Sequence, residues 1–333
     1  MNDTAADRDL ELVRKLDEAR RNIVAEVHAR IVGQDAVLEQ MLICLFARGH
    51  GLFVGVPGLA KTLLVRTLAE VLALDSKRIQ FTPDLMPSDI TGSDVLDENP
   101  TTGERSFRFV QGPVFAQLLL ADEINRTPPK TQAALLQAMA EGQVTASGHT
   151  HDLPKPFIVF ATQNPIEQEG TYPLPEAQLD RFFMQIDVGY PSERDEVEIV
   201  RRTTSPLVKS PGRVLEAADV LALQDLVPRV PIADHVIEHA VALVRATRPE
   251  DPRATTKAKS FLAYGAGPRA SQAIALAAKT RAVLHGRFVA ERQDVRAVAP
   301  AILRHRLVLS FRARAERIPV DAVIEDVLLA VPE

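Results

Sequence analysis

One short stretch of the sequence combines glycines, a lysine and a threonine at a spacing suited to binding phosphate. It follows an apolar run at 51–54 and opens a helical pattern at 61–74. In such a strand, loop and helix, successive backbone N–H groups converge on phosphate oxygens at the positive end of the helix dipole. We expect Lys61 to reach the β- and γ-phosphates of a nucleotide and the Thr62 hydroxyl to ligate Mg²⁺. The candidate phosphate loop comprises Gly55, Val56, Pro57, Gly58, Leu59, Ala60, Lys61, Thr62 and Leu63.

One position of this loop departs from the usual pattern, because Ala60 stands where a glycine normally precedes the lysine. Alanine adds only a methyl group and tolerates helical dihedral angles, so we expect the loop to close despite the difference. A chance turn is the alternative interpretation of the loop taken alone.

Two further predicted strands end in polar side chains. The apolar run at 118–121 ends in Asp122 and Glu123. We expect Asp122 to bind Mg²⁺ through water and Glu123 to act as the general base that polarises the attacking water. The run at 157–161 is followed by Asn164, whose amide can orient water or the γ-phosphate. The alternatives are two solvated acids at the end of one strand and an Asn-Pro turn after the other.

The elements that must position these side chains alternate between helical and strand patterns. Helical periodicity covers 8–30, 35–48 and 61–74, and apolar strand-like runs occur at 51–54, 78–81, 118–121, 157–161 and 184–188. This alternation predicts an α/β fold with a mostly parallel sheet.

Two stretches interrupt the alternation. The turn-rich segment 97–103, followed by the alternating segment 106–110, predicts a β-hairpin inserted before the strand at 118–121. The segment 143–153 predicts a second hairpin, with Gly148 near its tip. We expect both hairpins to project from the sheet rather than to extend it.

A linker is predicted at 203–213, which contains two Ser-Pro pairs and Gly212. Beyond this segment the strand patterns vanish and helical periodicity dominates. We therefore predict an α/β nucleotide-binding core with N-terminal helices over 1–205 and an all-α second domain over 206–333.

The composition is that of a globular protein, with 46% apolar and 25% charged residues among 333. The chain has 39 basic and 44 acidic residues, and its formal net charge of −5 argues against a protein that coats nucleic acid. Aromatic residues make up 5%, so platforms for stacking bases are scarce. The N-terminal residues do not resemble a signal peptide, and no run approaches the ~18 apolar residues of a membrane span. We expect a cytoplasmic protein with a buried thiol at Cys44.

Several motifs together resemble the MoxR branch of the AAA+ ATPases. They occur in the order and approximate spacing of that family, and an alanine at position 60 is familiar in this branch. The resemblance extends from about residue 30 to about residue 310. The matching segments are 31–34, 55–62, 81–89, 121–126, 161–165 and 179–182.

The resemblance implies a homo-oligomer, usually a hexameric ring, with ATP and Mg²⁺ bound between neighbouring subunits. It gives Asn164 the sensor-1 role and makes Arg181 the candidate arginine finger that reaches a neighbour's γ-phosphate. Arg269 resembles the sensor-2 arginine of a helical lid, and in this clade the lid is repositioned, so it can act on a neighbour's nucleotide. Gly33 and Gln34 fall in the segment that borders the adenine in such proteins.

The chemistry of arginine suits these roles, because its guanidinium is planar, always charged and bidentate toward phosphate. Simpler interpretations remain open. Arg181 could pair with the neighbouring Asp180, and Arg269 could cap or solvate the helix that begins near Ser271. Arg126 is another candidate for the interface arginine, and the sequence does not rank it against Arg181.

The resemblance also suggests a biological role. The hairpins at 93–110 and 143–153 match the helix-2 insert and the pre-sensor hairpin of this clade. MoxR proteins are similar to chaperones that act with von Willebrand A-domain proteins, so such a partner is expected and the client is left open. The alternatives are a magnesium-chelatase-like motor subunit, a nucleic-acid motor and a nucleotide-gated scaffold.

Two other patterns are interpreted as packing rather than chemistry. His235, Glu238 and His239 match a zinc-protease signature, but their apolar neighbours favour a packed helix. The basic segment 304–317 is interpreted as an amphipathic helix with a solvated basic face rather than a nucleic-acid site.

Overall fold

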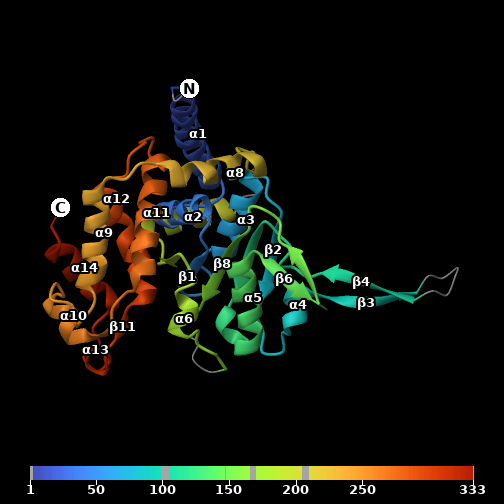
Figure 1. Ribbon diagram of the computed structural model, residues 1–333. Helices are drawn as coiled ribbons and strands as arrows, with labels where there is room; N and C mark the ends of the chain where they lie inside the picture. Colours follow the sequence, from blue (N-terminus) through green and yellow to red (C-terminus); the bar gives the residue numbers. More distant parts are fainter. Residues whose placement is uncertain (1–2, 99–104, 147, 166–169, 205–209, 333) are drawn as a thin grey trace.

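A five-stranded sheet lies at the centre of the computed structural model, which describes residues 3–98, 105–146, 148–165, 170–204 and 210–332 (Figure 1). The strand order is β2-β5-β8-β1-β9, and every neighbouring pair is parallel, which confirms the predicted parallel sheet. The order places β8 between β1 and β5, so the carboxyl ends of these three strands meet at one edge. The strands are β1 (Gly51–Val54), β2 (Ser76–Gln80), β5 (Leu118–Asp122), β8 (Ile158–Gln163) and β9 (Met184–Asp187).

Both faces of the central strands are buried, and alternate residues of β1, β5 and β8 enter two different apolar cores. On β5, Leu118 and Leu120 pack into one core, whereas Leu119 and Ala121 pack into the other. This alternation follows from the two-residue period of a strand, and it explains the continuous apolar run in the sequence. One core is covered by α1 (Asp3–His28), α2 (Asp35–Phe46) and α3 (Lys61–Val71), and the other by α4 (Pro87–Thr91) and α5 (Pro129–Glu141).

Two antiparallel hairpins leave the sheet, as the sequence predicts. The hairpin of β3 (Gly92–Glu98) and β4 (Arg105–Gln111) projects far from the body in Figure 1. Of the predicted turn-rich segment 97–103, residues 97 and 98 belong to β3 and the others lie outside the described residues. The second hairpin consists of β6 (Gln143–Ala146) and β7 (His149–Asp152). The ring of Phe109 stacks on His151 with 4.1 Å between centroids, so the bases of the two hairpins are in contact.

The C-terminal part of the chain is a helical lid. It packs on the core that contains α1 and α2, because apolar residues of the lid and of these helices form one continuous cluster. A short antiparallel pair, β10 (Leu262–Tyr264) and β11 (Val308–Leu309), adds strands that the sequence analysis did not predict. The lid helices are α8 (Ala217–Leu226), α9 (Asp234–Ala246), α10 (Thr256–Phe261), α11 (Pro268–Leu284), α12 (Arg292–Leu303), α13 (Phe311–Ala315) and α14 (Val320–Ala330).

The predicted amphipathic helix over 304–317 is wrong. The segment is divided into the 3₁₀ turn η3 (Arg304–Arg306), β11 and α13. The reason is ion pairing with carboxylates distant in sequence. Arg304 pairs with Asp187 and Asp321, and the buried Arg306 pairs with Asp180, so these arginines face carboxylates rather than water. The predicted packed helix around His239 is confirmed in α9, and the described residues contain no cluster of three His, Cys, Asp or Glu that could hold a metal.

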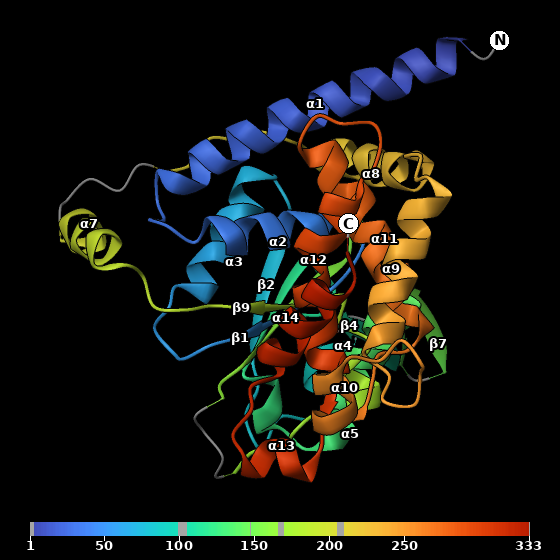
Figure 2. The same ribbon diagram turned by 90° about the vertical axis from the view of Figure 1, so that its left-hand side faces the viewer.

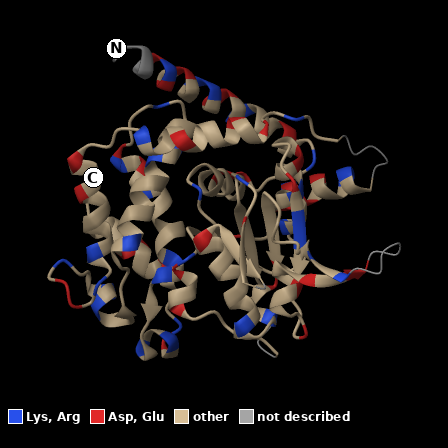
Figure 3. Ribbon diagram, turned by 45° about the vertical axis from the view of Figure 1, so that its right-hand side comes forward, with Lys and Arg blue, Asp and Glu red and all other residues tan. Residues whose placement is uncertain are grey.

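The passage from core to lid runs through α7 (Glu193–Thr203), which has no buried residue and lies on the side of the core away from α9 and α11 (Figure 2). The predicted linker overlaps the end of α7, and its centre at 205–209 is outside the described residues, so the domain boundary near 205 stays a prediction. Charges of both signs line the long α1 (Figure 3). Within the described part of the chain, no helix is both long and apolar enough to span a membrane.

The start of α3 carries a backbone conformation that alanine disfavours. Ala60, immediately before the helix, has φ 57° and ψ 16°, in the left-handed region. The expectation that alanine could close the loop is confirmed, but in left-handed rather than right-handed helical geometry. A side chain with a Cβ costs roughly 1–2 kcal/mol in this region, whereas glycine adopts it freely.

We predict that Ala60→Gly raises the free energy of unfolding by about 1 kcal/mol, because relief of this strain exceeds the added entropy of the unfolded chain. Ala69→Gly is the control, since Ala69 lies in the right-handed interior of α3 and should lose stability. Urea unfolding of both variants measures the difference. A destabilised Ala60→Gly protein would contradict the account.

A buried histidine joins the sheet to α5. The Nδ1 atom of His50 accepts the Val159 N–H at 3.0 Å, and its Nε2 atom lies 3.1 Å from the Met139 carbonyl oxygen. Because a carbonyl can only accept, Nε2 carries the proton and the ring is neutral. Burial lowers the pKa of His50 to about 4, although the hydrogen bond to Met139 opposes this shift.

The histidine predicts a loss of stability in mild acid. Because the folded pKa lies below the ordinary value of 6.5, the stabilisation is complete above pH 6.5 and declines as the pH falls toward 4. We expect a slope of about 1.4 kcal/mol per pH unit from this group. In His50→Gln this contribution to the slope should disappear, whereas His235→Gln, at an exposed position, should keep it. Unfolding titrations between pH 7 and pH 4.5 test this, and identical slopes in all three proteins would refute it.

Candidate functional site

The phosphate loop leaves the end of β1 and turns directly into α3, as predicted. Gly55 is required by packing, since a Cβ there would collide with the Val188 carbonyl oxygen on the neighbouring chain segment. Gly58 has φ +85° and faces open space, so a side chain there would strain the backbone and enter the hollow of the loop. The loop therefore keeps its backbone N–H groups accessible to a ligand.

Lys61 folds back over this hollow. Its Nζ atom donates to the carbonyl oxygens of Gly55 at 2.5 Å and of Val56 at 3.2 Å. Burial lowers the pKa of Lys61, and the carboxylates of Asp122 and Glu123 oppose that shift. Among the described residues, the ammonium group hydrogen-bonds only to backbone carbonyls of the loop. It is placed where a phosphate can replace these carbonyls.

The acidic pair at the end of β5 is held in place by side chains from the adjacent strands. One oxygen of Asp122 accepts the Thr162 hydroxyl at 2.6 Å, and the other accepts the Arg78 guanidinium at 2.6 Å. Glu123 accepts from Gln80 at 2.7 Å, and its own backbone N–H donates to the Thr162 hydroxyl at 2.8 Å. Both carboxylates are therefore oriented before any ligand binds.

The sequence analysis did not identify Arg78, Gln80 and Thr162 as site residues. Residues 78 and 80 share one face of β2, and the register places Gln80 beside Asp122. That register depends on which strands are neighbours, which the sequence does not show. Thr162 lies within β8 and is the first residue of the polar segment 162–165 that follows the predicted apolar run.

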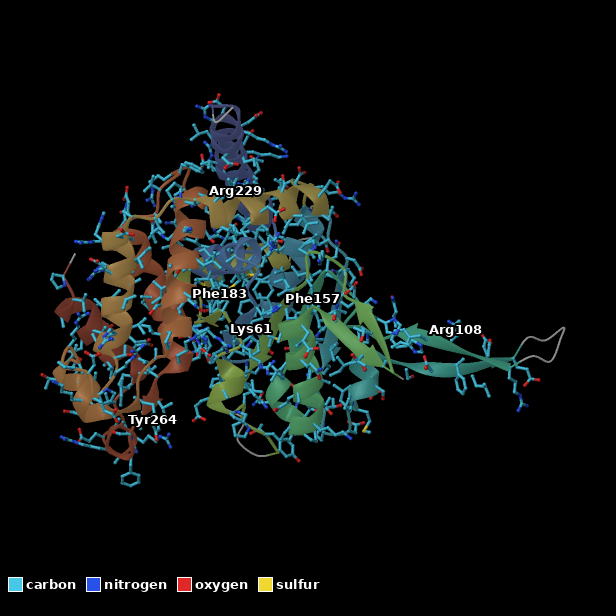
Figure 4. The ribbon with its side chains drawn as sticks, viewed as in Figure 1. Lys61, Arg108, Phe157, Phe183, Arg229 and Tyr264 are labelled. Atoms are coloured by element: carbon cyan, nitrogen blue, oxygen red, sulfur yellow. The ribbon has the colours of Figure 1, made fainter. Side chains whose placement is uncertain are left out.

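A cavity of about 440 Å³ joins the loop to the acidic pair, and its size suits a small-molecule ligand. Figure 4 places Lys61 near the middle of the molecule, between the lid helices and the sheet. Asn164, which is buried, reaches the same cavity from the end of β8. The lining residues are Pro57, Gly58, Leu59, Ala60, Lys61, Thr62, Leu63, Arg78, Gln80, Asp122, Glu123, Thr162 and Asn164.

A second, more apolar cavity of about 270 Å³ shares four residues of the loop with the first. Gln34 lines it, and its side chain donates to the Gly189 carbonyl oxygen at 3.3 Å. Gly33 does not line this cavity and instead lies against the Asp195 side chain. The remaining walls are mainly Ile31, Val32, Leu59, Leu63, Pro191 and Ile199. An apolar cavity next to a phosphate loop suits a flat base.

The oxygen donors in the first cavity fit a hard cation. The Thr62 hydroxyl and the Asp122 carboxylate line the same space, and Mg²⁺ prefers such oxygen ligands while keeping several waters. A site with few protein ligands is the usual arrangement when substrate phosphates complete the coordination.

Two predicted site residues lie elsewhere. Arg181 and Arg269 line a separate cavity of about 410 Å³ together with Asp180. Arg269 pairs with the Asp180 carboxylate at 3.0 Å, whereas the Arg181 guanidinium donates to the Leu136 carbonyl oxygen at 2.9 Å. Arg126 differs from both, because it pairs with Glu123 at 3.0 Å and therefore lies at the acidic pair of its own chain.

Known protein families match the core and the lid of this chain separately. Residues 50–184 match a family model described as "ATPase family associated with various cellular activities (AAA)", and residues 254–327 match an AAA lid domain. The protein "Chaperone MoxR1" of Mycobacterium tuberculosis is 46% identical over 310 residues, covering 92% of this chain and 80% of that protein. "Protein MoxR" of Methylorubrum extorquens is 32% identical over 336 residues, covering 93% and 95%.

A solved structure agrees with these relatives. The crystal structure of a putative ATPase from Cytophaga hutchinsonii superposes with a TM-score of 0.89 at 40% identity and covers 99% of this chain and 98% of its own. The likeness extends over core, hairpins and lid alike, and the chain belongs to the MoxR family of AAA+ ATPases.

Proposed function

We propose that the protein hydrolyses MgATP as a homo-oligomeric ring and uses the energy to remodel a partner protein. The observation that carries the proposal is the division of the site. Lys61, Asp122 and Glu123 surround one cavity, whereas Arg181 and Arg269 line another. A nucleotide in the first cavity would meet Arg181 and Arg269 of a neighbouring subunit rather than those of its own.

The loop would bind the triphosphate by replacing hydrogen bonds within the loop with hydrogen bonds to phosphate oxygens. The Lys61 ammonium would leave the carbonyls of Gly55 and Val56 and bind β- and γ-phosphate oxygens, which carry more negative charge. The base would enter the apolar cavity beside Gln34 and Leu63. Burial of the base supplies binding free energy, and the loop N–H groups fix the phosphates in register.

Hydrolysis depends mainly on positioning and charge neutralisation. Thr62 and Asp122 would hold Mg²⁺, which supplies positive charge to the developing transition state when bound. Glu123 would accept a proton from the attacking water, and the Asn164 amide would orient that water or the γ-phosphate. The Thr162 hydroxyl donates to the Asp122 carboxylate and accepts the Glu123 backbone N–H. Gln80 donates to the Glu123 carboxylate, so the base is oriented before the water arrives.

The proposed role in the cell is that of a chaperone-like motor in the cytoplasm. The M. tuberculosis relative is named a chaperone, and this chain would share that role. A von Willebrand A-domain protein is the proposed partner. The projecting β3–β4 hairpin presents exposed apolar side chains, including Phe107 at 75% exposure, and would contact the client. The contact between Phe109 and His151 would transmit movement between this hairpin and the β6–β7 hairpin.

The general base is tested by Glu123→Gln, which keeps the shape of the side chain and removes its basicity. We expect turnover to fall about 10²- to 10⁴-fold while ATP affinity changes little, because the base acts only in the chemical step. Phosphate release and equilibrium binding of a fluorescent ATP analogue measure the two quantities. Glu141→Gln, an exposed change at the end of α5, should leave both unchanged. Normal turnover in Glu123→Gln would remove Glu123 from this role.

Action between subunits is tested by mixing two inactive proteins. Arg181→Ala retains the loop and lacks the finger, and Lys61→Ala retains the finger and lacks a working loop. If Arg181 acts on a neighbour, roughly a quarter of interfaces in randomly mixed rings pair an intact loop with an intact finger. ATPase activity should therefore recover on mixing. Absence of recovery in rings shown to contain both subunits would contradict action in trans.

A further inference from the structure

We propose that His305 and Arg306 of the lid are positioning residues for Arg181, so that the arginine offered to a neighbour moves with the lid of its own subunit. This proposal rests on the proposed function, in which Arg181 acts in trans. Its basis is a set of contacts between η3 in the lid and the chain segment 180–183 in the core.

Arg306 makes most of these contacts. Its side chain is only 4% exposed, although it carries a charge. The guanidinium donates to the Asp180 carboxylate at 2.7 Å, to the Phe182 carbonyl oxygen at 2.8 Å and to the Ile302 carbonyl oxygen at 2.6 Å. A buried guanidinium is stable only when its donors are satisfied, so these carbonyls and this carboxylate must stay in place around it.

His305 adds a contact to the same carbonyl. Its Nε2 atom lies 3.0 Å from the Phe182 carbonyl oxygen, and because that oxygen can only accept, Nε2 carries the proton. The pKa of His305 is lowered to about 3 by burial and by the charge of Arg306, so the ring is neutral at physiological pH. The Phe182 carbonyl therefore accepts from two consecutive lid residues.

Both the core and the lid hold the segment that carries Arg181. On the core side, Phe182 is fully buried and the Arg181 guanidinium donates to the Leu136 carbonyl oxygen. The segment follows α6 (Glu176–Leu179), a helix of one turn in which no residue is buried. The carboxylate of Asp180 is shared between Arg306 and Arg269, both from the lid. Positions on either side of Arg181 are thus bound to the lid, and these bonds act together with the hydrogen bond to Leu136 in orienting the finger.

Within one chain, the nucleotide can influence the contacts that His305 and Arg306 make with the segment 180–183. Ile199, Arg202 and Thr203 of α7 line the base cavity, and α7 precedes the lid helices in the chain. Filling that cavity would bias the position of α7 and hence of the lid. The finger presented to the neighbour would then report on the nucleotide held by its own subunit.

The first measurement separates positioning from general damage. In Arg306→Gln we expect kcat to fall about 10- to 100-fold, as expected for a misplaced transition-state group, while binding of an ATP analogue to the intact loop stays within about twofold. Arg304→Gln is the matched control. Arg304 belongs to the same turn but pairs with Asp187 and Asp321 rather than with 180–183, so this variant should keep kcat.

The decisive test places the change in the subunit that donates the finger. Lys61→Ala subunits, with and without Arg306→Gln, are mixed with Arg181→Ala subunits, and ATPase activity is measured in rings shown to contain both. Every active interface then uses an unaltered loop and acidic pair. We expect Arg306→Gln in the donor to lower the recovered activity about tenfold or more, and Arg304→Gln in the donor to leave it unchanged.

The outcomes distinguish the two levels of the account. No recovery with the Lys61→Ala donor itself would reject action in trans, and with it this proposal. Full recovery with the Arg306→Gln donor would overturn the positioning role alone. If Arg306→Gln subunits do not assemble, two substitutions of His305 test the proposal instead. His305→Leu in the donor should lower the recovered ATPase activity, and His305→Gln, which keeps an N–H donor of similar reach, should restore it. Equal recovery with both His305 variants would overturn the proposal.

Discussion

A triphosphate carries several negative charges on one small group. A protein can bind it only where hydrogen-bond donors converge on the phosphates and carboxylates lie far enough away not to repel them. The parallel sheet provides this arrangement at one edge. The loop after β1 offers N–H groups and Lys61, whereas the acids Asp122 and Glu123 follow β5 and are separated from the loop by β8. The intervening strand keeps cationic and acidic halves facing across a cavity rather than neutralising each other in direct contact.

This constraint explains why the rest of the site is built from neighbouring strands. Arg78 and Gln80 on β2, with Thr162 on β8, bind the two acids from either side and hold them open toward the cavity. Arg181 does not lie at this edge of the sheet but lines another cavity beside the lid. In the proposed function, the chemistry would be divided between a preorganised half-site and a guanidinium whose position depends in part on contacts with the lid.

The sequence points to those candidate site residues that belong to local patterns, and it misses those whose partners depend on tertiary packing. Lys61 and Glu123 follow from motifs on single strands. By contrast, Arg78 belongs to the site only because β2 pairs with β5, and nothing in its own segment indicates that pairing. The segment 304–317 has helical periodicity, but ion pairs with distant carboxylates outweigh that preference. The left-handed geometry of Ala60 was likewise imposed by the turn into α3.

The central claim is that a triphosphate is held by the loop at 55–62 opposite the acidic pair. Isothermal titration of the full chain with a non-hydrolysable ATP analogue and Mg²⁺ tests it most directly. Loss of a charge-assisted contact predicts that Lys61→Ala weakens binding about 10- to 100-fold, whereas Lys77→Ala, at an exposed position on β2, leaves it unchanged. Wild-type affinity in Lys61→Ala would show that the nucleotide is bound elsewhere.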